Sequence, residues 1–277
     1  MFKKVTIIIF IILFFCPFLL LANRQNSKPV VGSQIDWSNP LSRGLVGCWL
    51  MNEGGGAKII NLKNSQKETL TNAVWQNYIK GSSIYTDNDQ YIQFTNKISG
   101  YGITNKMTAV WMGVVTGIAT DQSGFLWGQH DNDSLTYDWG IYRSYSTQRF
   151  AFYITTATAL SATMPNNSSP LNLPSMVVGT YDGANIKIYQ NGIAGTITAQ
   201  TGNVTNVDNF YLGYTWGNLG VSYVLMKTSY LLLFNRALSP SEIRSLYENP
   251  YQFIKPPTIW SNFSTAVAAA RRIFMVQ

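Results

Sequence analysis

Short apolar stretches alternate with polar turn clusters from Ile35 onward. The apolar stretches are rich in Val, Ile, Tyr, Phe and Trp, and the clusters between them are rich in Gly, Asn, Asp, Ser and Thr. This pattern favours an all-β sandwich or barrel, because βαβ units would need helical segments between the strands. The predicted strands are 44–51, 83–85, 91–94, 107–116, 124–128, 139–143, 149–155, 175–181, 185–190, 209–213 and 222–234.

Two dipeptides mark tight turns. Asp182-Gly183 separates two apolar stretches and predicts a hairpin, because such turns need residues that tolerate a positive φ. Asn191-Gly192 ends the second of these strands in the same manner.

One short helix is predicted near the C-terminal end. Ser239 is a candidate N-cap, Pro240 would occupy the first helical position, and Glu242 completes a capping box. Its apolar face comprises Ile243, Leu246 and Tyr247.

The N-terminal segment has the layout of a secretory signal. Lys3 and Lys4 precede an almost wholly apolar run, 5–22, and the candidate cleavage point follows Ala22. The run is also long enough for an uncleaved anchor, so both alternatives stay open. The sequence therefore predicts export to the periplasm, the cell surface or the medium, with membrane contact only through this segment if it is retained.

The rest of the chain divides into three parts. All-β sandwiches of 200–250 residues often form one domain, so we expect a single domain over 35–254. A short linker, 23–34, precedes it, and a tail, 255–277, follows.

Composition narrows the class further. The chain is 14% aromatic and only 12% charged, which favours strands over charged amphipathic helices. Its net charge of +7 is scattered along the sequence, whereas nucleic-acid binding usually needs a clustered basic surface, so no nucleic-acid partner is expected. Cys48 lies in an apolar strand and is predicted to be a small core residue.

Five segments, in this order, resemble one known pattern. An apolar strand with Trp49 runs into a Gly-rich loop, an acidic turn precedes a Tyr-containing strand, and a central strand carries Trp111. The hairpin and the capped helix complete the pattern, and together the segments are similar to the laminin G-like branch of the concanavalin A-like lectin/glucanase superfamily. The resemblance implies a jelly-roll sandwich of two antiparallel sheets with one short C-terminal helix. The segments are 44–56, 83–94, 107–112, 178–192 and 234–247.

The chain departs from the family at two places. A Trp-His pair often precedes the family's hairpin strand, where this chain has residues 173–176, Leu-Pro-Ser-Met. An acidic pair in the last long strand is replaced by Thr228 and Ser229.

The residues argue against catalysis. Glucanases of the superfamily use two glutamates on one face of a strand, where they flank the glycosidic bond. No predicted strand carries such a pair among Glu53, Glu68, Glu242 and Glu248. One histidine, His130, does not supply a multi-histidine zinc site, and no serine lies in a nucleophile-elbow sequence. We therefore expect a protein that is not an enzyme.

An acidic loop between two aromatic residues is a candidate calcium site. Asp131, Asp133 and Asp138 lie between Trp127 and Trp139, and carboxylates on a flexible loop suit Ca²⁺. The resemblance implies a site shared with the loop 214–220, with Asp131, Asp133 and Asn218 as ligands. A solvated polar turn without metal is the alternative.

Aromatic residues near these loops could stack on sugar rings, although some are expected in the core. Trp216, in a Gly-rich loop, is the best candidate for an exposed ring, and an acidic turn could add a polar rim. The candidate ligand-binding residues are Trp127, His130, Trp139, Tyr142, Tyr214, Trp216, Asp87 and Asp89.

Together these features predict an exported, non-catalytic, lectin-like module that binds glycan or a glycosylated surface, with Ca²⁺ as a candidate cofactor. Two alternatives stay open. One is a structural, adhesion, phage or surface-assembly module that binds protein, and the other is a degenerate glycoside hydrolase.

Overall fold

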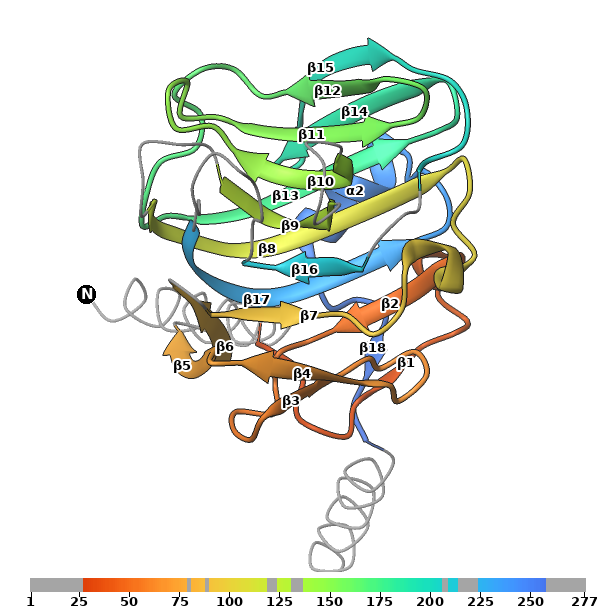
Figure 1. Ribbon diagram of the computed structural model, residues 1–277. Helices are drawn as coiled ribbons and strands as arrows, with labels where there is room; N and C mark the ends of the chain where they lie inside the picture. Colours follow the sequence, from red (N-terminus) through yellow and green to blue (C-terminus); the bar gives the residue numbers. More distant parts are fainter. Residues whose placement is uncertain are drawn as a thin grey trace, which may run out of the picture.

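Two large antiparallel sheets pack face to face in the computed structural model (Figure 1). The structure describes residues 27–78, 81–87, 90–118, 124–130, 137–205, 209–213 and 224–257. This architecture confirms the predicted all-β jelly-roll sandwich of two antiparallel sheets with a short C-terminal helix.

Sheet I faces the viewer in Figure 1 and contains eight strands. Its central strands are joined by antiparallel pairing on both sides, and β12 and β3 form its edges. In spatial order the strands are β12 (Ala159–Thr163), β11 (Phe150–Thr155), β10 (Tyr137–Arg143), β9 (Gly124–His130), β16 (Phe210–Leu212), β7 (Tyr91–Gln93), β4 (Lys67–Thr71) and β3 (Lys58–Ile60).

Sheet II lies behind sheet I and is built around two long strands, β8 and β17. One edge of β17 pairs with β8, whereas its other edge pairs with β6 and then with β2. The strands are β15 (Ile193–Ala199), β14 (Asn185–Gln190), β13 (Pro174–Tyr181), β8 (Met107–Ile118), β17 (Val224–Phe234), β6 (Gly81–Thr86), β5 (Val74–Tyr78) and β2 (Leu45–Trp49).

The main core lies between the two sheets and is rich in aromatic rings. Trp49 of sheet II makes edge-to-face contacts with Phe94, Trp127 and Phe210 at centroid distances of 4.9, 6.2 and 6.4 Å. Trp111 of the central strand β8 has no exposed surface, and its Nε1 donates to Thr228 Oγ1 at 3.0 Å. Thr228, which replaces the family's acidic residue, therefore has a structural role in this core.

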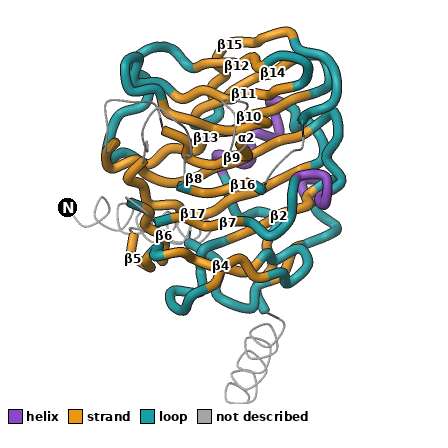
Figure 2. Tube along the Cα trace, in the orientation of Figure 1, coloured by secondary structure: helices purple, strands orange, loops and turns teal. Residues whose placement is uncertain are grey.

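A second cluster covers the outer face of sheet II. Helix α2 (Pro240–Glu248) packs there, together with η1 (Pro40–Ser42) and the segments that flank the domain; Figure 2 shows the helix in purple behind the sheets. The cluster includes Cys48, which is fully buried, and burial raises the pKa of its thiol. The prediction that Cys48 is a core residue is confirmed.

The local signals in the sequence are confirmed. Gly183 has a φ of 91° in the β13–β14 turn, and Asn191 and Gly192 have φ values of 52° and 78° in the β14–β15 turn. Ser239 caps α2 in a complete capping box with Glu242. Among the described residues, no helix combines the length and apolar character that a bilayer crossing requires.

The described part of the predicted linker, from residue 27 onward, is hydrogen-bonded to the domain. Lys28 Nζ donates to the carbonyls of Met51 and Ser82, and Asn52 Nδ2 donates to the Pro29 carbonyl at 2.9 Å. Strand β1 (Gln34–Ile35) then pairs with β18 (Ile254–Lys255). These hydrogen bonds link segments far apart in the sequence, which composition does not reveal.

Candidate functional site

Sheet I presents aromatic side chains on its outer face. In β11, Phe152 and Ile154 belong to the core, so the intervening Tyr153 lies on the opposite side of the strand. In β10, Ile141 is a core residue and Tyr142 lies outside. No helix or strand that the structure describes packs over this face (Figure 1).

Three of these rings form a contiguous cluster, the aromatic platform, defined as Phe125, Tyr142 and Tyr153. Tyr142 pairs directly with Phe125 across β9 and β10, and their ring centroids are 5.7 Å apart. Tyr153 lies 5.4 Å from Phe125 and 6.1 Å from Tyr142, at tilted or edge-to-face angles. Phe125 and Tyr142 are half-buried, so each keeps some surface open to a ligand.

A second pair of rings lies across a glycine gap from the platform. Tyr91 and Tyr211 have centroids 6.0 Å apart. The register places Gly128 and then Gly140 between Tyr211 and Tyr153 in one row across the strands. A Cβ on Gly140 would lie only 3.0 Å from Tyr153 Cε1 and 3.1 Å from Phe125 Cδ1. The glycine therefore allows these two rings to lean over β10.

The charged residues of β10 have little exposed surface. Arg143 is 3% exposed, and its Nε and Nη2 donate to the Ser169 carbonyl at 3.2 and 2.9 Å. Burial lowers the pKa of this guanidinium. Asp138 is 2% exposed. The aromatic platform therefore offers apolar ring faces and tyrosine hydroxyls, which suit an uncharged ligand.

Two predicted binding residues are core residues instead. Trp127 and Trp139 have no exposed surface, and their rings meet edge to face at 5.3 Å inside the sandwich. They also contact Phe210 at 6.1 and 5.7 Å. Neither ring can stack on a sugar, so these two predictions are wrong. The pairing of Trp127 with Ile141 turns it inward.

Tyr142 and Asp87 are the predicted residues whose side chains the structure places at the surface. Tyr142 belongs to the aromatic platform. Asp87 follows β6, is half-buried, and accepts a hydrogen bond from the Tyr85 hydroxyl at 3.1 Å. Outside the described residues lie Asp89, Asp131, Asp133, Tyr214, Trp216, Asn218 and the side chain of His130.

Sequence comparison decides the family. A family model described as the concanavalin A-like lectin/glucanases superfamily, of the laminin G type, matches residues 86–244, more than half of the chain. This chain belongs to the concanavalin A-like lectin/glucanase superfamily. No curated protein sequence matches it.

Solved structures that share the superfamily fold with this chain include an enzyme and toxin domains. A Trypanosoma rangeli sialidase in complex with the inhibitor DANA has a TM-score of 0.56 and 16% identity over 76% of this chain and 33% of the sialidase. The binding domain of Paraclostridial Mosquitocidal Protein 1 has a TM-score of 0.59 and 13% identity over 76% of this chain. The binding domain of botulinum neurotoxin DC in complex with SialylT has a TM-score of 0.57 and 11% identity over 77%. This chain spans a third of the sialidase and 53% of each toxin domain.

All four glutamates are described, and none lies on the outer face of sheet I. Glu53 Oε1 accepts from the Ile60 amide at 2.8 Å, and Glu68 is fully buried in the interior. Glu242 belongs to the helix cap, where hydrogen bonds from Arg236 lower the pKa of its carboxyl to about 2. Glu248 pairs with Arg244 on the same helix. The carboxylate pair that superfamily glucanases use therefore has no counterpart among the glutamates.

Metal ligands do not gather in the described part of the chain, where no group of three or more His, Cys, Asp or Glu side chains could hold an ion. The predicted calcium ligands Asp131, Asp133 and Asn218 belong to segments outside this part. Asp138 lies in β10 and is buried.

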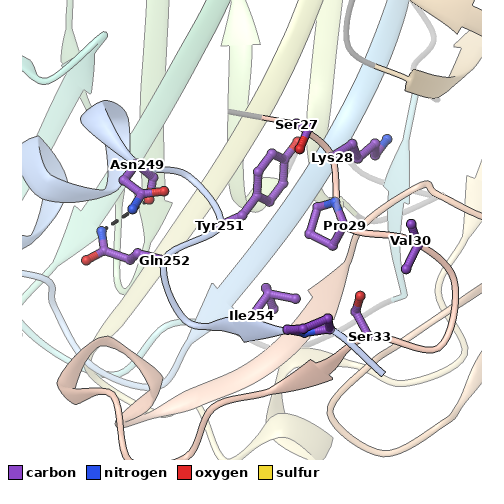
Figure 3. A pocket seen from close by; sticks show the side chains of 10 residues that line it. Ser27, Lys28, Pro29, Val30, Ser33, Asn249, Tyr251, Gln252 and Ile254 are labelled. Atoms are coloured by element: carbon purple, nitrogen blue, oxygen red, sulfur yellow. Dashed lines mark hydrogen bonds between the residues drawn. The ribbon is translucent and has the colours of Figure 1, made fainter. Parts of the chain in front are cut away.

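Two cavities lie on the side of sheet II, away from the aromatic platform. One, of about 430 Å³, separates the N-terminal arm at Lys28 and Pro29 from the loop at Asn249 and Tyr251 (Figure 3). The other, of about 350 Å³, lies between α2 and β13 and is lined by Met112, Met176 and Tyr247. Neither cavity is lined by any of the ligand-binding residues that the sequence predicted.

Proposed function

We propose that this chain is an exported, non-catalytic carbohydrate-binding module that holds a glycan against the aromatic platform. The observation that carries the proposal is the contact between half-buried Phe125 and Tyr142 on a sheet face that no described element covers. The C–H groups of a pyranose pack on such ring faces, and tyrosine hydroxyls can hydrogen-bond its hydroxyl groups.

The comparisons support a carbohydrate ligand at a coarse level. The superfamily is named for lectins and glucanases, and two structural neighbours carry the sialidase inhibitor DANA and SialylT. Shared fold does not transfer a ligand, so the platform itself carries the argument. Export is proposed from the apolar N-terminal run alone.

The positions of the glutamates support binding without catalysis. The glucanases of the superfamily use two carboxyl groups that flank one bond. Glu68 is enclosed in the interior and Glu242 is committed to the helix cap, so neither can reach a sugar on the platform.

Calcium remains part of the proposal as an optional cofactor. Asp131, Asp133 and Asn218 would supply the hard oxygen ligands that Ca²⁺ prefers. The connection between β9 and β10 contains the two aspartates, and these strands also carry Phe125 and Tyr142. A calcium ion there would hold β9 and β10 together at His130 and Tyr137, whereas Phe125 and Tyr142 lie near the opposite ends of the same strands.

A glycan array with added Ca²⁺ and with chelator tests the proposal. We expect wild-type protein to bind a defined glycan set, Tyr142→Ala to lose most of the signal, and Tyr247→Ala to retain it. Tyr247 is 41% exposed on α2, on the other side of the molecule, and is therefore a matched control. If the wild type binds no glycan under either condition, the proposal is contradicted. If the wild type loses its glycan signal only in the presence of chelator, calcium is required for binding.

A protein-binding module is the second candidate, and the cavity beside α2 favours it. Its lining combines Met112 and Met176, whose flexible side chains suit an adaptable interface. If the array is silent and a protein partner is captured by wild type and Tyr142→Ala but lost with Tyr247→Ala, this second function is correct.

A further inference from the structure

Four buried polar atoms in one region have no hydrogen-bond partner in the protein. They are Trp49 Nε1, Asn61 Nδ2, Glu68 Oε1 and Tyr101 OH. Trp49, Asn61 and Glu68 have no exposed surface, and Tyr101 is 6% exposed. Leaving such a group buried and unpaired disfavours the folded state, so four together call for a ligand.

The four side chains converge from separate elements. Trp49 and Asn61 face each other in an antiparallel bridge, and the ring centroids of Trp49 and Tyr101 are 6.1 Å apart. Burial and the charge of Glu68 raise the pKa of Tyr101, and the nearby side-chain amides of Asn96 and Asn61 offset part of this increase. Because its pKa is raised, the Tyr101 hydroxyl stays protonated beside Glu68 and Asn61. Tyr101 is the last residue of η2 (Ile98–Tyr101).

The second polar atom of the Asn61 and Glu68 side chains is hydrogen-bonded, and these bonds fix the orientation of both side chains. Asn61 Oδ1 accepts from the amides of Cys48 and Lys63, each at 3.0 Å, so its Nδ2 is the end that remains. Glu68 Oε2 accepts from Thr95 N at 2.9 Å and from Thr95 Oγ1 at 2.7 Å, so Oε1 remains. The site therefore has two N–H donors, one carboxylate acceptor and one hydroxyl that can do either.

We propose that these atoms form an internal hydration site that holds a bound water molecule. The two N–H donors disfavour a cation, and the carboxylate of Glu68 disfavours an anion. A water can accept from Trp49 and Asn61 and donate to Glu68, with the Tyr101 hydroxyl as its fourth partner. This site joins β2 of sheet II to β4 of sheet I and to η2, and it is independent of the proposed glycan binding.

A crystal structure of the full chain at about 1.5 Å resolution is the first test. We expect a density peak within about 2.6–3.2 Å of at least three of the four atoms. Direct pairing of Tyr101 OH with Glu68 Oε1 without a peak would overturn the proposal. So would a peak with ligand distances of about 2.3–2.6 Å, which indicate a metal ion.

The Tyr101→Phe variant gives a second test in solution, with Tyr181→Phe as control. Tyr181 is also buried, and its hydroxyl donates directly to the Gly202 carbonyl at 2.8 Å. If water satisfies Tyr101, both variants should lower the folding equilibrium constant, each by about tenfold. If the Tyr101 hydroxyl is unsatisfied, its removal will leave the constant unchanged or raise it, and the proposal fails.

Discussion

The outer faces of the two sheets differ in what covers them, although in both sheets the side chains of each strand alternate between the core and the outer face. On sheet II, Val110, Val178 and Leu232 are fully buried beneath α2 and the flanking segments. On sheet I, the rings of Phe125 and Tyr142 stay half-buried on a face without a described covering element. The side chains of the covered face, aromatic as well as aliphatic, are enclosed, whereas the aromatic side chains of the uncovered face keep some exposed surface and can bind as well as pack.

Because of this difference, we expect the covered face of sheet II to contribute mainly to folding stability and the uncovered face of sheet I mainly to ligand binding. Aliphatic residues under the helix gain from burial and offer no hydrogen bonds, so changes there should act on folding. Tyrosines on the other face keep a hydroxyl and an exposed ring face, so changes there should act on binding first.

Leu232→Ala should have the largest effect. We expect it to lower the free energy of unfolding by about 2–5 kcal/mol, because it opens a cavity under α2. Leu160→Ala on sheet I is the control, since Leu160 is 38% exposed and should lose much less. Urea denaturation measures both. Equal losses would show that the two faces do not differ in this way.

Lys28 should make stability depend on pH. Burial lowers its pKa from 10.5 to about 7 in the folded protein, partly offset by the charge of Glu53. Between these values the unfolded chain holds a proton that the folded chain lacks, so the unfolding free energy rises with pH. We expect a rise of about 1–3 kcal/mol from pH 7 to pH 10. Lys28→Met should abolish this rise and exposed Lys58→Met should keep it; the same slope in both would refute the assignment.

Tyr142→Ala should weaken glycan binding about tenfold, equivalent to about 1.4 kcal/mol. The loss of one stacking ring from the platform is the reason, and Phe125 and Tyr153 remain to hold part of the ligand. Calorimetric titration with a glycan found on the array measures the change. An unaltered affinity would place the binding site away from the platform.

Ser239→Ala should have the smallest effect, about 1 kcal/mol of unfolding free energy. The change removes the hydrogen bond from the Glu242 amide to Ser239 Oγ and so weakens the cover over sheet II. Thermal unfolding followed by circular dichroism measures it. Glycan affinity should stay unchanged, and a parallel loss of affinity would show that the two faces are coupled.

The sequence predicted those elements that carry a strong local signal, such as an apolar strand, a capping box or a glycine turn. The strand 185–190 matches β14, and the capping box of α2 and the turns at Gly183 and Gly192 all appear as expected. By contrast, β4, β12 and β15 were missed. Their residues are largely Thr, Ala, Ser and Lys, which resemble a turn cluster until pairing partners supply the sheet.

The binding residues were harder to predict because register decides which face a side chain takes. Trp127 and Trp139 looked suited to stacking, but their pairings with the core residues Ile141 and Ile154 place them between the sheets. Tyr142 was predicted, whereas Phe125 and Tyr153 were not, although they flank it on β9 and β11.

The pairing of β1 with β18 brings the two ends of the described domain into one short ladder on the side of sheet II. Such a domain can be inserted into a loop of a host protein, because its first and last strands are adjacent. It can also be circularly permuted there with little rearrangement. In either setting the platform would still point away from the junction.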